Sequence, residues 1–343
     1  MYKYACILLI ACLLQSCSKD SEVNDDNTII LEFSPSPIAL NEIDASFAND
    51  IAYGPDERNT FDIFMPTSDE PTALVIYIHG GGFLGGEKEN AYEPLWNDSW
   101  DVPSEIRILL SQNIAFASIN YRLLAFEGDQ EGVLKSLNDS KRCLQYIRTI
   151  SNVLNIDSNN IVLCGSSAGA GTSQWLAFSD DMADPDNEDP VLRASTRVKA
   201  IAVKATQASY DLLRYETDIF LEYDFSWLSY FQIDPSMKAR FMSFYGINEL
   251  YEFNSDDITS YRQKIDMLAM LSEDDPEFWV SNPQSPTVMP TQSNILNHHG
   301  FHARILKQFG DNVGVPNVVY YADYDDPTGE GFVEFMIRKT QED

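Results

Sequence analysis

The sequence is poor in cysteine and in basic residues, and each shortage excludes a class of protein. It contains 5 cysteines, and three of them precede residue 18. The remaining two, Cys143 and Cys164, cannot build a disulfide framework, and their place in a predicted helix and a predicted strand favours packed thiols. Lys and Arg number 23 against 53 Asp and Glu, a formal net charge of −30. So acidic a chain repels phosphate backbones, which excludes nucleic acid as a partner.

Histidine is scarce as well, and this limits the candidates for a catalytic base. The 4 histidines are His79, His298, His299 and His302. His298 and His302 are spaced to share a helix face, but no third ligand stands at a suitable spacing, so we expect no metal site.

The N-terminus predicts export. The apolar run from Ala5 to Leu14 is too short to span a bilayer and has the length of a signal-peptide core. The four residues that end at Cys17, Leu-Gln-Ser-Cys, resemble the lipobox of bacterial lipoproteins, in which the cysteine is acylated. We expect a signal over residues 1–16, a lipid-anchored tether over 17–45 and one domain over 46–343, on the periplasmic or cell-surface face of the outer membrane. An ordinary secretory signal with a chance cysteine is the alternative.

Apolar runs and amphipathic segments alternate along the chain. This order predicts an α/β domain with a mostly parallel central sheet and helices on both faces. The expected strands are 60–65, 73–78, 114–119, 160–164, 198–203, 287–289 and 317–321; the expected helices are 105–110, 132–155, 168–178, 299–309 and one from 331. Residues 206–285 are rich in aromatics and predict a helical insertion that caps a cleft, although most of these rings could simply pack the insertion's own core.

Two glycine motifs carry the chemistry. Gly165, Ser166, Ser167, Ala168 and Gly169 fit G-x-S-x-G between a predicted strand and a predicted helix. A sharp strand-to-helix turn there lifts the Ser167 hydroxyl out of the backbone as a nucleophile.

The second motif, His79-Gly80-Gly81-Gly82, follows a buried strand. The amides of Gly81 and Gly82, with that of Ala168, could form an oxyanion hole. The motif lacks a P-loop lysine and the GxGxxG spacing, so nucleotide binding is not favoured.

Both motifs in this order resemble the α/β-hydrolase superfamily, in its hormone-sensitive-lipase-like and carboxylesterase branch. The stretch from Thr60 to Lys88 is similar to bacterial feruloyl and acetyl xylan esterases. The resemblance implies an α/β-hydrolase fold and cofactor-free hydrolysis of small acyl or feruloyl esters, including esters linked to polysaccharide. It also implies structural roles for His79, Gly80, Gly165 and Gly169.

The resemblance breaks near the C-terminus, where the family places its histidine after the last strand. Glu330 stands there instead, and the family's acid position is occupied by Ser293-Asn294. The roles could be exchanged, with His298 or His299 as the base and Asp325 or Asp326 as the acid; Asp211 is a further candidate acid. Two alternatives stay open: a degenerate site kept for binding, or a different alignment of the C-terminal part.

Overall fold

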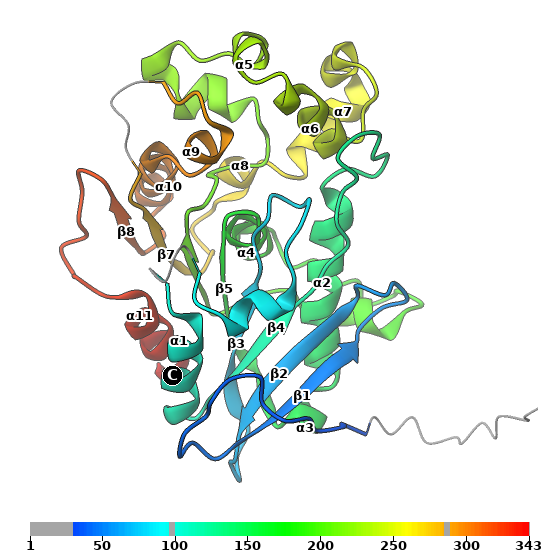
Figure 1. Cartoon of the computed structure of the whole chain (residues 1–343), viewed down its shortest axis with the longest axis vertical. Coiled ribbons are helices and arrows are strands. Elements are labelled where there is room, and N and C mark those ends of the chain that lie inside the picture. Colours follow the sequence, from blue (N-terminus) through cyan, green and yellow to red (C-terminus); the bar gives the residue numbers. More distant parts are fainter. Residues whose placement is uncertain (1–29, 96–99, 285–288, 343) are drawn as a thin grey trace, which may run out of the picture. The chain divides into compact units, whose positions relative to one another are not determined.

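The computed structural model describes residues 30–95, 100–284 and 289–342. In this part of the chain one eight-stranded sheet forms the centre, with strand order β1-β2-β4-β3-β5-β6-β7-β8 (Figure 1). The strands are β1 (Ala45–Ala52), β2 (Thr60–Pro66), β3 (Thr72–Ile78), β4 (Ile114–Ile119), β5 (Ile156–Ser166), β6 (Ala200–Lys204), β7 (Glu277–Asn282) and β8 (Asn317–Tyr321).

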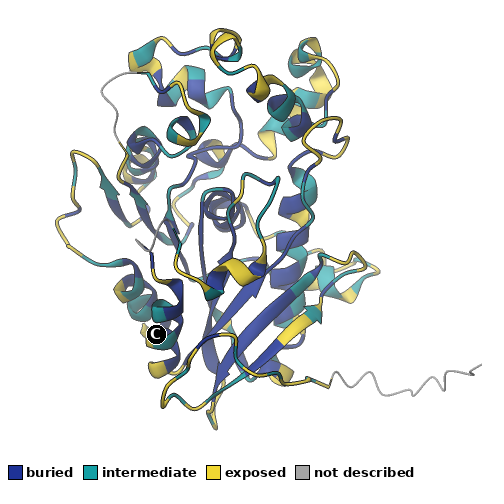
Figure 2. Ribbon diagram, in the orientation of Figure 1, coloured by how far each residue is buried: buried dark blue, intermediate teal, exposed yellow. Residues whose placement is uncertain are grey.

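The sheet is antiparallel at one edge and parallel elsewhere. β1 pairs with β2 and β2 pairs with β4 in antiparallel fashion, whereas the remaining pairs, β4–β3, β3–β5, β5–β6, β6–β7 and β7–β8, are parallel. β3 and β4 are buried along their whole length, as continuous apolar runs predict for strands covered on both faces (Figure 2).

Helices cover both faces. α1 (Val102–Ser111) and α11 (Phe332–Gln341) pack together on one face, where Ile106 and Phe335 join Tyr77, Phe116 and Val162 in a common core. The other face carries α2 (Leu134–Thr149), α3 (Ser151–Leu154), α4 (Ala168–Phe178) and α10 (Gly300–Val313). The mostly parallel α/β sheet with helices on both faces is thus confirmed.

Short helices between β6 and β7 gather beyond one end of the strands and form a cap (Figure 1). They are η3 (Tyr215–Ile219), η4 (Leu221–Tyr223), α5 (Trp227–Ile233), α6 (Ser236–Tyr245), η5 (Leu250–Asn254), α7 (Asp256–Gln263) and α8 (Met267–Met270). Outside the cap lie η1 (Lys88–Tyr92), η2 (Pro190–Arg193) and α9 (Ser293–Asn297). Several cap aromatics, among them Phe220 and Tyr245, are buried within it, so part of its aromatic content packs its own core.

Three expectations need correction. The strand that precedes the histidine loop is β7, inside the range assigned to the insertion, whereas Met289 is not in a strand and residues 287–288 lie outside the described residues. β1 was not predicted. The expected tether reaches too far, because Ile38 is only 8% exposed in the core and Leu40 and Ile43 pack beside it.

The remaining predictions concern cysteine and the membrane. Cys143 and Cys164 are free and buried, which confirms packed thiols. Within the described ranges, every helix is too short or too polar to cross a bilayer. Cys17 and the signal segment lie outside the described residues.

Candidate active site

Ser167 occupies a strained turn between β5 and α4. Its φ of 51° and ψ of −120° lie in a region that L-residues rarely adopt, which costs on the order of 1–3 kcal/mol. The turn is held because the Ser167 amide donates to the Lys204 carbonyl at 3.2 Å and the Gly171 amide donates to the Ser167 carbonyl at 3.1 Å. The Ser167 side chain therefore stands clear of the backbone and partly exposed, as G-x-S-x-G predicts.

The elbow is pressed against the end of β3. A Cβ on Gly169 would lie 1.9 Å from the Ile78 carbonyl oxygen, and one on Gly165 would lie 2.6 Å from the same atom. No side chain fits at either position without moving backbone. The glycines therefore set how closely Ser167 approaches the turn that follows Ile78.

That turn is the triple-glycine segment. A Cβ on Gly80 would lie 3.2 Å from the Ser167 Cβ, and Gly81 needs its φ of 110° to bring its backbone beneath Gly85. Gly81, Gly82 and Ala168 line one cavity together with Ser167. The two motifs, far apart in the sequence, thus lie side by side, as an oxyanion hole requires.

The segment after β4 supports the glycine turn through Tyr121 and is itself held by Asp139. The Tyr121 hydroxyl donates to the His79 carbonyl at 2.8 Å, and the Tyr121 ring stacks on the His79 imidazole at 4.3 Å. The Arg122 guanidinium in turn donates two hydrogen bonds, each 2.8 Å, to the buried Asp139 carboxylate. The buried His79 is therefore held by Tyr121 and supports the glycine turn that follows it.

His298 is the histidine that meets the serine. Its Nε2 lies 2.9 Å from the Ser167 Oγ, across 131 positions of sequence. The distance allows the hydroxyl to donate to Nε2 when the ring proton resides on Nδ1. The preceding residue is anchored, since the Asn297 carbonyl accepts from the Gln207 amide at 2.9 Å and its side chain accepts from the Tyr215 hydroxyl at 3.1 Å.

His299 and His302 bind backbone groups instead of Ser167. His299 caps α10, because its Nδ1 accepts from the Phe301 amide at 3.0 Å. His302 is fully buried; its Nδ1 accepts from the Ala208 amide and its Nε2 lies 3.1 Å from the Leu296 carbonyl. The described residues contain no cluster of three or more His, Cys, Asp or Glu suited to a metal. The structure thus places His298, and neither His299 nor His302, at Ser167.

The expected acids are not at the imidazole. Asp326 accepts from the Val319 amide and from the amide and hydroxyl of Thr328, which uses its carboxylate to build its own loop, and Asp325 is exposed. Asp211 is held by Arg262 and caps the following turn at Leu213. In the described ranges no carboxylate bonds to His298. The proposed pairing with Asp325 or Asp326 is therefore not found.

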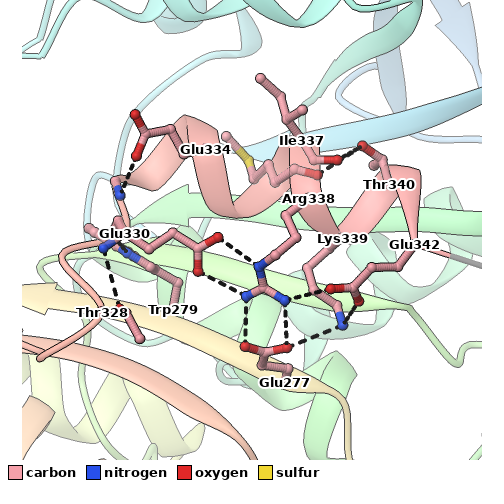
Figure 3. Close-up of polar contacts among 12 residues, drawn as sticks. Glu277, Trp279, Thr328, Glu330, Glu334, Ile337, Arg338, Lys339, Thr340 and Glu342 are labelled. Carbon is pink, nitrogen blue, oxygen red and sulfur yellow. Dashed lines mark hydrogen bonds and ion pairs between the residues drawn. The ribbon is translucent and has the colours of Figure 1, made fainter.

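Glu330, at the place where the family carries its histidine, serves the fold. Figure 3 shows its carboxylate facing the Arg338 guanidinium of α11, with distances of 2.7 and 2.9 Å. Arg338 also donates to Glu277, the first residue of β7, at 2.8 Å. This network joins α11 to the start of β7, so Glu330 has a structural role.

The Ser167 hydroxyl opens into a cavity of about 500 Å³ between the sheet and the cap, a size that suits a small-molecule ligand. Its wall includes the aromatic side chains of Phe83, Tyr210, Tyr215, Trp227, Phe241 and Phe244. The cap therefore covers the serine, as the aromatic segment predicted. The wall also includes Arg240, which no sequence pattern marked, because a basic residue in an aromatic-rich helix carries no local sign of its position.

Burial sets the protonation of the imidazole. It lowers the pKa of His298 from 6.5 to about 4, because the charged form loses its hydration. At neutral pH the ring is thus neutral and able to accept a proton.

Part of the chain is similar to known esterases. The BD-FAE family model matches residues 61–219, which contain both glycine motifs. The probable carboxylesterase 2 of Arabidopsis thaliana is 29% identical over 154 residues, covering 43% of this chain and 45% of that protein. The chain thus spans less than half the length of this curated relative.

Solved structures agree on the fold. An acetyl ester-xyloside bifunctional hydrolase from Caldicellulosiruptor lactoaceticus aligns over 87% of this chain and 88% of its own, with a TM-score of 0.54 and 17% identity. A truncated carbohydrate esterase from gut microbiota aligns over 88% and 99%, with a TM-score of 0.57 and 15% identity. The chain thus has an α/β-hydrolase fold similar to that of these esterases.

The family match ends before the site is complete. It stops at residue 219, well before His298 in the sequence. The family match thus includes Ser167 and the glycine turn but does not include His298.

Proposed function

We propose that this protein is a serine carboxylic ester hydrolase. The observation that carries the proposal is the 2.9 Å approach of the His298 Nε2 to the Ser167 Oγ at the mouth of an aromatic cavity. A neutral imidazole within hydrogen-bond reach of a hydroxyl is the arrangement that nucleophilic acyl transfer needs.

In the proposed reaction His298 accepts the Ser167 proton while the Oγ attacks the ester carbonyl. The amides of Gly81, Gly82 and Ala168 donate to the oxyanion, and each such donor stabilises the transition state by about 3 kcal/mol. The imidazolium then protonates the leaving alcohol. Water, deprotonated by His298, attacks the acyl-enzyme and releases the acid and the free serine.

Small acyl groups and feruloyl groups are the proposed substrates, on low-molecular-weight or polysaccharide-linked alcohols. Support comes from the size of the cavity and from its aromatic wall, on which sugar and phenolic rings can pack. The two structural relatives are an acetyl ester-xyloside bifunctional hydrolase and a carbohydrate esterase, and both support this substrate class.

The decisive test is reactivity of the purified protein. We expect hydrolysis of p-nitrophenyl acetate and butyrate, and a fluorophosphonate adduct that peptide mass spectrometry maps to Ser167. A folded protein that neither turns over these esters nor takes up the probe would rule out the esterase.

The pH profile tests the state of the base. Since burial lowers the pKa of His298 to about 4, kcat/KM should stay level from about pH 8 to 6 and fall as pH drops through about 4. The sign follows from protonation, because an imidazolium cannot accept the Ser167 proton. An acid limb near pH 6.5 would contradict the buried, neutral imidazole.

Acid stability is the control for that profile. Burial also lowers the pKa of His79 to about 4 and that of His302 to about 3. The unfolded chain, with histidine pKa values near 6.5, therefore binds more protons, and the free energy of unfolding should decrease as pH falls below 6.5. Rates at low pH are valid only if activity returns on transfer to pH 7.

A second function is favoured by one observation, namely that no carboxylate among the described residues bonds to His298. A cleft without an activated base would serve in binding at a cell surface instead. Failure of the probe to react, together with specific binding of an aromatic ester, would support this alternative.

We further propose that Cys17 is acylated and anchors the protein to the outer membrane. The lipobox-like residues that end at Cys17 support it. Expression in a Gram-negative host with an alkyne fatty acid should label the wild type and leave Cys17→Ala unlabelled, with the latter released from the membrane fraction. Equal labelling of both proteins would contradict the anchor.

A further inference from the structure

Arg240 reaches from the cap to the glycine turn. It lies on α6, and its Nη2 would be 2.8 Å from a Cβ built on Gly82. The same cavity is lined by Arg240, Ser167 and His298. A guanidinium group therefore stands beside the proposed oxyanion turn, inside the space that a substrate would occupy.

The charge of Arg240 is not matched within the described part of the chain. It forms no ion pair there, and the acceptor found for it is the Met237 sulfur at 3.8 Å, a weak contact. Asp234 is the acidic residue whose charge acts on it most, yet that carboxylate accepts from the amide and hydroxyl of Ser236.

Other cap arginines show what a satisfied guanidinium looks like in this protein. Arg214 pairs with Asp266 at 2.7 Å and with Asp218 at 3.1 Å. Arg262 donates two hydrogen bonds to Asp211, at 2.8 and 3.0 Å. The cap thus supplies carboxylates to the arginines that hold it together and none to the one in the cavity.

The surroundings make this cation costly unless a ligand neutralises it. Burial among apolar and aromatic side chains lowers the pKa of Arg240, although a guanidinium remains charged at neutral pH. A carboxylate is the group that best matches its planar donors, because two parallel hydrogen bonds form in a site with little water. A protein with a net charge of −30 repels anions over most of its surface. The positive charge of Arg240 in the cavity therefore decides whether an anionic ligand binds there.

We propose that Arg240 binds a carboxylate of the substrate, and that the preferred esters carry a free carboxyl group. This rests on the esterase function proposed above. The carboxylate can belong to the acyl part, as in a monoester of a dicarboxylic acid, or to the alcohol part, as in an O-acetylated uronic acid. In both cases water cleaves the ester bond at Ser167 and the free carboxylate is unchanged.

Two matched substrate pairs separate these sources. Mono-p-nitrophenyl adipate is compared with p-nitrophenyl hexanoate, and an O-acetylated methyl glucuronoside with the corresponding acetylated methyl glucoside. We expect kcat/KM to favour the anion in one pair, and Arg240→Met to lower that preference about 10- to 100-fold through a higher KM, the effect expected for a lost hydrogen bond to a charged group. Arg240→Lys should restore part of it.

Lys238→Met is the matched control. It removes one positive charge from the same helix, but Lys238 is exposed and does not line the cavity. It should leave the preference for the anion unchanged. A preference that Arg240→Met leaves intact in both pairs, or an equal loss on neutral and anionic esters, would overturn the proposal; the equal loss would assign Arg240 to the oxyanion instead.

Binding separates this proposal from the esterase function. Calorimetry with Ser167→Ala and adipate or glucuronate should show binding that Arg240→Met weakens at least tenfold. Hydrolysis of neutral esters without any anion preference or binding would refute carboxylate recognition and leave the esterase standing. Arg240-dependent binding without hydrolysis of any ester would refute the esterase and uphold carboxylate recognition.

Discussion

Replacing Ser167 by alanine is expected to lower kcat for short-chain p-nitrophenyl esters by about 10⁴- to 10⁶-fold and to abolish the fluorophosphonate adduct. The reason is that the Oγ is the atom that forms the acyl-enzyme, and it is the hydroxyl that lies 2.9 Å from the His298 imidazole. The substitution removes one atom from a partly exposed side chain and keeps the turn backbone. Thermal unfolding should therefore shift little while the rate collapses.

Ser166 provides the matched control, because it is the adjacent serine and also borders the cavity. It is 4% exposed, and the contact with the His298 imidazole is made by Ser167 instead. Ser166→Ala should still take up the probe. A Ser167→Ala protein that keeps more than about a hundredth of the wild-type rate would show that another group performs the chemistry.

Replacing His298 by alanine is expected to lower kcat by about 10³-fold or more, with KM changed far less. Without the imidazole no described group lies in reach to take the Ser167 proton, and the hydroxyl becomes a poor nucleophile. The rate of fluorophosphonate reaction should fall in parallel, because that step needs the same proton transfer. Single-turnover kinetics with p-nitrophenyl acetate would measure the acylation rate directly.

His299→Gln and Asp326→Asn separate position from catalysis. His299 caps α10, and Asp326 accepts hydrogen bonds within the β8–α11 loop. Both substitutions should therefore lower the melting temperature and leave the kcat of the folded fraction almost unchanged. If instead His298→Ala stayed active and His299→Gln did not, the geometry described for the imidazole would be wrong.

The missing acid has a physical consequence for the rate. In serine proteases a buried carboxylate fixes the imidazole tautomer and stabilises the imidazolium, and its replacement by an amide costs about 10⁴-fold in kcat. Here His298 is positioned through its backbone neighbourhood, by Gln207 and Tyr215 at Asn297, instead of by a carboxylate. Packing thus orients the His298 imidazole, but no carboxylate among the described residues stabilises the positive charge that the ring gains in the reaction.

The sequence alone determined the elements whose signal is local. β3 and β4 follow from continuous apolar runs, α4 begins directly after Ser167 as the glycine pattern requires, and the triple glycine follows β3. Such features depend on the backbone preferences and side-chain spacing of a few consecutive residues. The α/β-hydrolase fold and the place of Ser167 could therefore be predicted from the chain itself.

Only the tertiary structure decided which imidazole meets the serine, where the acids go and what Arg240 faces. His298 and His299 are adjacent in the sequence, yet one is directed at Ser167 and the other caps a helix, because Asn297 is held by Gln207, which follows β6, and by Tyr215 of the cap. β7 itself was hidden in an aromatic-rich stretch whose composition resembles that of the cap. A contact that spans 131 residues depends on how loops pack, and no local pattern encodes it.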